Sequence, residues 1–340
     1  MTNDALPATE YRKFSFEKLC DKLSQKADTL ILFHIRPDGD AVGSAFSLCN
    51  ILRELGNKVF CVCDDEVPDR LKFIVNNEQK STLVSVLDKD FIPERIISVD
   101  CAAKNQLGEL AHIYKDEINI MIDHHRTGSP FADNYIDPDA AATGEIIFEV
   151  AQELYSRKVL SQITKRICET SYAAISSDTG CFKYSNTTVK THLIAAEIIK
   201  SQIDSAKINF LLFDAKTKEQ LEVSRFAIEH LKLYDGGKIS IISASYDDIS
   251  KNNFTKDNLD ILIDVARSIH SVHAAVSIRQ LETKKQFKVS MRANEDIDVS
   301  IVCSVFGGGG HVRAAGCTVT AESESEAIEI LLNELRKQIK

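Results

Sequence analysis

Two patterns of apolar residues alternate along the first half of the chain. Short continuous apolar runs are typical of parallel strands that are covered on both faces, whereas apolar residues at every third or fourth position indicate the buried side of a helix. The continuous runs predict strands at residues 29–33, 58–63, 95–99 and 118–122. The helical spacing predicts helices at residues 14–26, 144–158, 162–178, 187–202 and 217–233, and one that carries Val42, Ala45, Cys49 and Leu52 and stops at Gly56.

The pattern changes in the last third of the chain. Strand-like segments at 238–243, 273–279 and 287–292 are interleaved with a helix at 257–269. The segment "YDGGK" should end the preceding helix, and a terminal helix should begin after Ser323, with Glu326 completing a capping box. These features predict a smaller α+β domain.

The order of elements indicates the fold class. We expect an α/β protein with a doubly wound, mainly parallel sheet, followed by the smaller α+β domain, because strands that alternate with helices build parallel sheets. A chain of 340 residues is long enough for two domains. We place the first domain at 1–190, a helical linker at 191–225 and the second domain at 226–340.

Composition and charge limit the partners. No apolar run is long enough to span a membrane, and the N-terminus lacks a basic region followed by an apolar stretch, so we expect a cytoplasmic protein that does not bind membranes. The net charge of −9 argues against a surface that tracks long duplex nucleic acid. Short anionic substrates remain compatible with it.

The cysteines give no sign of disulfides or of a zinc site. Nine are scattered along the chain, without the paired spacing of a zinc ribbon or of a secreted disulfide framework. We expect them to be reduced, and we interpret Cys61, Cys63 and Cys101 as small buried apolar residues rather than metal ligands.

Polar residues follow three of the predicted strands directly. They are His34, Asp38 and Asp40 after the first apolar run, Asp100 after the third, and Asp123, His124 and His125 after the fourth. Asp178 stands at the end of the helix predicted over 162–178, before Gly180. Because the carboxyl ends of parallel strands meet at one edge of the sheet, these groups should converge there.

Imidazoles together with several carboxylates suit a divalent first-row metal, with manganese or magnesium favoured as the number of carboxylates rises. The set exceeds what one ion needs, and a pair of ions roughly 3.5 to 4 Å apart serves phosphoryl hydrolysis. Each residue also has a simpler interpretation. Asp40 and Asp100 fit helix caps, the "PDG" segment fits a turn, and the paired histidines fit a polar strand end.

The arrangement His34-x-x-x-Asp38-x-Asp40, then Asp100, then Asp123-His124-His125, then Asp178-Thr179-Gly180 resembles the four-motif signature of the DHH phosphoesterase superfamily. The resemblance implies a site for two manganese ions, with magnesium as the alternative. His34 and Asp38 would hold one ion, Asp40, His124 and Asp178 would hold the other, and Asp100 would bridge both. His125 would face the scissile phosphate, and Asp123 would act on a ligand histidine.

The segment "GGGGHVRAAGC" at 307–317 and the strand "VSMR" at 289–292 resemble the first type of DHH-associated domain. Backbone N–H groups of a glycine-rich loop can approach an anion closely, and basic side chains add charge-assisted hydrogen bonds to phosphate. A hinge or a tight turn is the alternative for a glycine run. The residues that we expect to bind substrate are Ser290, Arg292, Gly308, Gly309, Gly310, His311 and Arg313.

Within the superfamily, the two-domain length resembles the nanoRNase A class. This implies a phosphoesterase that hydrolyses short oligoribonucleotides, including linearised cyclic dinucleotides, and also 3′-phosphoadenosine 5′-phosphate, with the active site between the two domains. Its partners would be short RNA or nucleoside bisphosphates, and a homodimer stays open. A manganese-dependent inorganic pyrophosphatase and a non-catalytic nucleotide sensor are the alternatives.

Overall fold

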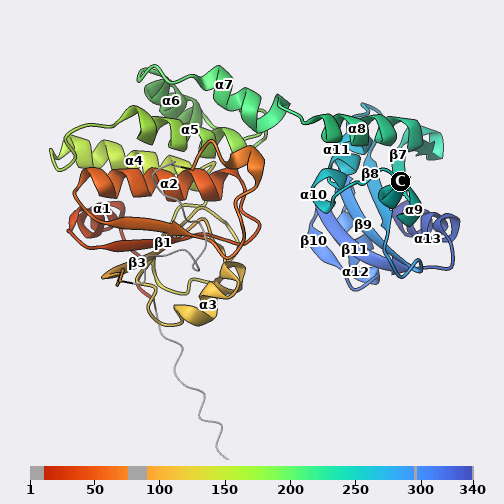
Figure 1. Ribbon diagram of the computed structural model, residues 1–340, viewed down its shortest axis with the longest axis horizontal. Coiled ribbons are helices and arrows are strands. Elements are labelled where there is room, and N and C mark those ends of the chain that lie inside the picture. The colour runs from red at the N-terminus through yellow and green to blue at the C-terminus, as the bar shows by residue number, and fades with distance from the viewer. Residues whose placement is uncertain (1–10, 76–89, 295–296, 339–340) are drawn as a thin grey trace, which may run out of the picture. The chain divides into compact units, whose positions relative to one another are not determined.

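The structure is a computed structural model that describes residues 11–75, 90–294 and 297–338 (Figure 1). Its contacts divide the chain into two compact units, Met1–Ala215 and Lys216–Lys340. The division falls within the segment 191–225, where we placed a helical linker. Each unit is described below by itself.

The first unit is built on a parallel sheet in the order β2-β1-β3-β4-β5. Its strands are β1 (Thr29–Leu32), β2 (Val59–Val62), β3 (Arg95–Val99), β4 (Ile120–Asp123) and β5 (Asp133–Ile136). The four predicted strands are confirmed. The edge strand β5 was not predicted, because its sequence "DNYI" has neither an apolar run nor strict alternation.

Helices cover both faces of this sheet. They are α1 (Phe16–Ser24), α2 (Gly39–Glu54), α3 (Leu110–Ile113), α4 (Thr143–Ser156), α5 (Lys165–Asp178), α6 (Val189–Ile199) and α7 (Ser205–Asn209), with the short turns η1 (Asp69–Leu71), η3 (Lys104–Leu107) and η4 (Phe210–Asp214). Ile31 of β1 packs in the core shared with α2, α4 and α5, whereas its neighbours Leu30 and Leu32 pack on the opposite side with Leu110 of α3. Figure 1 shows α2, α4 and α5 on one side of the sheet and α3 on the other. The doubly wound α/β prediction is confirmed.

The second unit contains a mixed sheet in the order β10-β11-β9-β8-β7-β6, in which only β7 and β8 pair in parallel among the described strands. Its strands are β6 (Leu231–Tyr234), β7 (Ile239–Ala244), β8 (Ala274–Gln280), β9 (Gln286–Ala293), β10 (Gly309–His311) and β11 (Ala314–Thr320). Its helices are α8 (Lys218–His230), η5 (Asp235–Gly237), α9 (Tyr246–Lys251), α10 (Lys256–Leu259), α11 (Ile261–Arg267), α12 (Val299–Val305) and α13 (Glu324–Arg336). This is the predicted smaller α+β domain.

Two local predictions for the second unit were wrong. Helix α8 ends at His230, before the "YDGGK" segment, because the chain enters the partly exposed edge strand β6. The predicted capping box of α13 is incomplete. Ser323 accepts a hydrogen bond from the backbone N–H of Glu326, but the Glu326 carboxylate accepts from the N–H of Glu322 at 2.8 Å instead of from Ser323.

The glycine segment forms a hairpin, where we predicted a glycine-rich loop within 307–317. Gly309–His311 make up β10, which pairs with β11 through a two-residue turn at Val312 and Arg313. A Cβ atom at Gly308 would clash with the carbonyl oxygen of Gly316, and one at Gly310 would clash with that of Ala314. Close approach of the two strands therefore accounts for glycine at both positions. In the described part of the chain, no helix has the length and apolar character needed to cross a membrane.

Candidate metal centre

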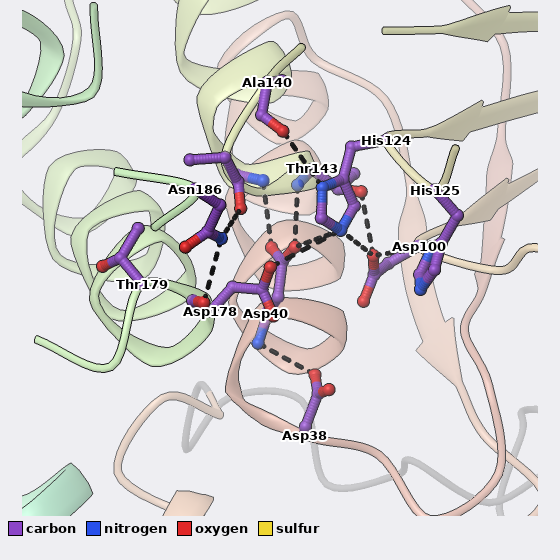
Figure 2. A network of polar contacts seen from close by, with 12 residues as sticks. Asp38, Asp40, Asp100, His124, His125, Ala140, Thr143, Asp178, Thr179 and Asn186 are labelled. Carbon is purple, nitrogen blue, oxygen red and sulfur yellow. Dashed lines mark hydrogen bonds and ion pairs between the residues drawn. The ribbon is translucent and has the colours of Figure 1, made fainter. Parts of the chain in front are cut away.

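The predicted site residues converge at one edge of the parallel sheet, as expected from the topology. His34 follows β1, Asp100 follows β3, and Asp123 ends β4, and these three strands are neighbours in the order β1-β3-β4. Asp178 is the last residue of α5. Figure 2 shows His124, His125 and Asp100 with Asp40 and Asp178 around a common space.

The described residues contain three groups of side chains that could each hold a metal ion, with potential ligand atoms within 4.8 Å of one another. The groups are His34 with Asp38 and Asp100, Asp40 with His124 and Asp178, and Asp100 with His124 and His125. The first two are the ligand sets implied by the sequence resemblance. Asp100 connects them, because it also belongs to the third group with His124.

The two carboxylate oxygens of Asp100 face different histidines. Oδ2 lies 3.7 Å from Nε2 of His34, and Oδ1 lies 3.7 Å from Nε2 of His124. Asp100 has a φ of 54°, in the left-handed region that costs an L-residue roughly 1 to 2 kcal/mol. The backbone is thus held in an unfavourable conformation at the residue that lies between the two groups.

Both histidines are oriented by backbone carbonyl groups. Nδ1 of His34 lies 2.8 Å from the carbonyl oxygen of Ile35, and Nδ1 of His124 lies 3.2 Å from that of Ala140. An N–H at Nδ1 that donates to these carbonyls leaves the Nε2 lone pair directed at the carboxylates. His124 Nε2 lies 3.6 Å from Asp178 Oδ2 and 3.8 Å from Asp40 Oδ2. This donor set of imidazoles and carboxylates fits divalent first-row ions.

Asp38 and Asp40 also stabilise helix ends. Asp38 is the N-cap of α2, since its Oδ1 accepts hydrogen bonds from the N–H groups of Asp40 and Ala41, both at 3.0 Å. Asp40 is therefore not the cap of its own helix, in contrast to the alternative considered above. Its carboxylate accepts from the N–H groups of Thr143 and Gly144, at 2.7 and 3.0 Å, at the start of α4.

Asp123 pairs with His125, since its Oδ1 lies 2.7 Å from Nδ1 of that ring. His125 belongs to the third group that could hold a metal ion, and the role of Asp123 toward a ligand histidine stays a prediction. Residues two apart at a strand end project to the same side, which favours this pair over His34 or His124. The side chain of His125 is 40% exposed, whereas Asp123 is buried.

The acids and imidazoles perturb one another in the absence of a cation. Burial raises the pKa of Asp178 to about 6, and the charge of Asp100 adds to this effect. Burial and the charges of Asp100 and Asp178 raise the pKa of Asp40 well above its usual range. Burial would lower the pKa of His34, but Asp100 and Asp38 outweigh it and raise the pKa to about 9. The concentration of negative charge favours a bound cation.

The structure places the predicted substrate residues of the second unit on β9 and on the hairpin. Ser290 and Arg292 alternate along β9 with buried residues, and they lie opposite Gly316 and Ala314 of β11. Gly309, Gly310 and Arg313 are exposed in the adjacent hairpin, where His311 is the last residue of β10. These residues therefore share one part of the second unit, and their contact with substrate stays a prediction.

Some residues of the site were not found from the sequence. Thr143 and Gly144 bind the Asp40 carboxylate, and the Ser44 hydroxyl donates to it at 2.7 Å. Asn186 donates to the carbonyl oxygen of Asp178 at 3.1 Å. Threonine or glycine at a helix start, serine inside a helix and asparagine in a turn are all ordinary, so no local pattern distinguishes these positions. The signal that could have found Thr143 is the alanine before it, which cannot cap α4 with its own side chain.

The interpretation of the cysteines agrees with the structure. Cys61 and Cys63 are buried in the core with α2, and Cys101 is buried on the other side of the sheet. Burial raises the pKa of the Cys101 thiol to about 12, which disfavours the thiolate form that binds metals. Within the described residues, no cysteine belongs to a group that could hold a metal ion.

Comparisons with known proteins agree with the fold and the site. The N-terminal domain of the DHH family matches residues 28–175, and the DHHA1 domain matches residues 238–340. These matches and the site define a phosphoester hydrolase. The chain therefore carries an N-terminal domain of the DHH family, followed by a DHHA1 domain.

Relatives match the chain over most of its length. The bifunctional oligoribonuclease and PAP phosphatase NrnA of Bacillus subtilis is 27% identical, over 92% of this chain and 96% of that protein. The protein of the same name from Thermus thermophilus is 25% identical, over 91% of this chain and 89% of that protein. An exopolyphosphatase-related protein from Bacteroides fragilis has a similar structure, with a TM-score of 0.84, 22% identity and 95% of each chain covered. This last likeness shows the shared fold.

Proposed function

We propose that this protein is a metal-dependent phosphoesterase that hydrolyses short oligoribonucleotides and 3′-phosphoadenosine 5′-phosphate. The observation that carries the metal dependence is the placement of Asp100, whose two oxygens face His34 on one side and His124 on the other. The substrate class is supported by the NrnA relatives, which are named as oligoribonucleases and PAP phosphatases. Linearised cyclic dinucleotides belong to the same class of substrate.

The groups around Asp100 fit two divalent ions, for which we propose manganese, with magnesium as the alternative. His34, Asp38 and Asp100 would hold one ion, and Asp40, His124, Asp178 and Asp100 would hold the other. When bound, the ions supply an activated water and stabilise negative charge on the phosphoryl group. The carbonyls of Ile35 and Ala140 keep the two histidines in the tautomer that leaves Nε2 available for binding.

The other residues would orient the substrate and protons around it. Asp123 holds His125 through Nδ1, which leaves Nε2 of His125 for the scissile phosphate. Ser290, Arg292 and Arg313, the hairpin glycines Gly308, Gly309 and Gly310, and His311 would bind the remainder of a short nucleotide. The position of the substrate between the two domains stays a prediction, as do a homodimer and a cytoplasmic location.

A substrate panel tests this proposal. Purified protein is assayed with a diribonucleotide, a five-nucleotide RNA, 3′-phosphoadenosine 5′-phosphate and inorganic pyrophosphate, each with manganese, with magnesium and with chelator. We expect hydrolysis of the nucleotide substrates that chelator abolishes and manganese restores best. Hydrolysis of pyrophosphate alone would identify a pyrophosphatase, and tight nucleotide binding without turnover would identify a sensor. Turnover that is indifferent to chelator would contradict the metal dependence.

A further inference from the structure

Thr143, the first residue of α4, contacts two of the proposed metal ligands. Its backbone N–H donates to Oδ2 of Asp40 at 2.7 Å, and its hydroxyl donates to Oδ1 of Asp100 at 2.9 Å. The residue is completely buried. Figure 2 shows the contacts of Thr143 with the carboxylates of Asp40 and Asp100 as dashed lines.

The two contacts of Thr143 have different requirements. Any residue except proline would supply the N–H that binds Asp40, and Gly144 supplies a second one at 3.0 Å. The hydrogen bond to Asp100 needs a hydroxyl group at position 143. Capping of α4 therefore does not explain why the side chain is threonine.

The orientation of the Asp100 carboxylate is the property that this hydroxyl controls. The terminal torsion of an aspartate side chain is broad, so rotation of the carboxylate needs little energy unless a partner fixes it. The Thr143 hydroxyl holds Oδ1 of Asp100 on the side of His124, where this oxygen lies 3.7 Å from Nε2 of the ring. The other oxygen, Oδ2, is then directed at His34. A rotated carboxylate would lose the arrangement in which each oxygen faces its own group of ligands.

We propose that Thr143 is a positioning residue that orients the carboxylate of Asp100 so that one oxygen is available to each ion. The inference rests on the proposed function, in which Asp100 connects two metal sites. It adds a residue that acts through the shared ligand, by determining the orientation of the Asp100 carboxylate. Groups in this position commonly change metal affinity or activity by roughly 10- to 100-fold when they are removed.

Three variants isolate the hydroxyl group. Thr143→Val removes the hydroxyl and keeps the β-branched shape of the side chain. Thr143→Ala removes both the hydroxyl and the methyl group, and Thr143→Ser retains the hydroxyl. Thr170→Val is the matched control, because Thr170 is also buried but its hydroxyl bonds to the carbonyls of Arg166 and Ile167 within α5. Circular dichroism and thermal melting of the metal-free proteins identify any variant that does not fold.

Manganese binding to the metal-free proteins is measured by calorimetry and by electron paramagnetic resonance of the free ion. We expect the dissociation constant of at least one ion to rise roughly 10-fold or more in Thr143→Val and Thr143→Ala. We expect it to stay within about threefold of wild type in Thr143→Ser and Thr170→Val. In assays with a dinucleotide, kcat should fall in the first two variants while KM changes little, because substrate contacts are retained.

Each outcome has a separate meaning. Wild-type protein that binds neither manganese nor magnesium contradicts the proposed function. Wild-type binding together with unchanged binding in Thr143→Val and Thr143→Ala contradicts only the positioning role. A crystal structure of the metal-free Thr143→Val variant tests the inference without any ion. It should show the Asp100 carboxylate turned or in several orientations, and an unchanged orientation would overturn the inference.

Discussion

Asp123 and His125 form a short contact, 2.7 Å between Oδ1 and Nδ1, at the end of β4 beside the groups that could hold metal. The carboxylate is buried, whereas the imidazole is partly exposed. The hydrogen bond to Asp123 is the main reason why the pKa of His125 rises to about 9, against the opposing effect of burial. The buried acid thus fixes both the orientation and the charge of the histidine.

This pair predicts a pH dependence for the metal-free protein. Because the folded-state pKa of His125 lies above its usual value of 6.5, its stabilising contribution is fully present below pH 6.5 and is lost as the pH rises through 9. In Asp123→Asn this contribution to the free energy of unfolding at low pH should be smaller than in the wild type. Urea unfolding of both proteins at pH 6 and pH 10, in chelator, should therefore give a larger difference in the free energy of unfolding at pH 6. An equal difference at both values would contradict the pairing.

Asp100→Asn should abolish hydrolysis while the fold is retained, because the side chain keeps its shape but loses the charge that connects the two groups of ligands. Calorimetric titration with manganese should show loss of tight binding, and circular dichroism should match wild type. The matched control is Asp116→Asn, because this side chain is exposed and lies on the segment before β4. Full turnover by Asp100→Asn would exclude the two-metal interpretation.

Arg292→Ala should weaken the binding of nucleotide substrates more than it weakens the binding of the metal ions. A charge-assisted hydrogen bond contributes about 1.5 to 3 kcal/mol, so kcat/KM for a dinucleotide should fall roughly 10- to 100-fold. For a small diester such as bis-p-nitrophenyl phosphate, kcat/KM should fall much less, and manganese binding should not change. His311→Ala should show the same selectivity, and Lys285→Ala, in an exposed ion pair with Glu322, is the control. Equal losses for both substrates would refute the assignment of Arg292 and His311 to substrate binding.

The hairpin glycines should separate into packing and binding positions. Gly308→Ala should destabilise the protein by about 1 to 3 kcal/mol, because a Cβ atom would meet the backbone of β11. Gly309→Ala should leave the free energy of unfolding within about 0.5 kcal/mol, because open space surrounds its position. Denaturant unfolding measures both effects. A loss of dinucleotide turnover in Gly309→Ala, with normal stability, would support a substrate contact at this glycine.

Cys101→Ala and Cys61→Val should leave the metal dependence of hydrolysis unchanged. Both thiols are buried in apolar surroundings, on opposite sides of the sheet. The manganese concentration for half-maximal activity, measured for both variants and for wild type, checks this expectation. Loss of bound manganese in the Cys101→Ala protein would show that a ligand had been misassigned.

The sequence was sufficient for the parts of the structure that depend on short segments. Buried parallel strands are visible as continuous apolar runs, and their topology alone brings His34, Asp100 and His124 to one edge. The glycine hairpin was missed because four glycines have no apolar pattern, and their strand forms only by pairing with β11. Edge strands β5 and β6 were missed for a related reason, since partly exposed strands lack a continuous run.

Interactions between distant segments could not be predicted in this way. The Asp40 carboxylate and the N–H of Thr143 are separated by 103 residues in the chain, and only the packing of α2 against α4 brings them together. The partner of Asp123 depends on side-chain directions at the strand end, which a motif does not record. Sequence motifs therefore identified the chemical groups, whereas the residues that orient them required the three-dimensional structure.

The Asp40 carboxylate at the start of α4 has a consequence for how this site can change during evolution. Ala142 offers α4 no side-chain cap, so the helix depends on an acid that belongs to another helix. Replacement of Asp40 would leave buried N–H groups without their acceptor, even in a protein that no longer hydrolysed anything. In descendants that lose activity, we therefore expect Asp40 to persist after Asp178 and His34 have diverged.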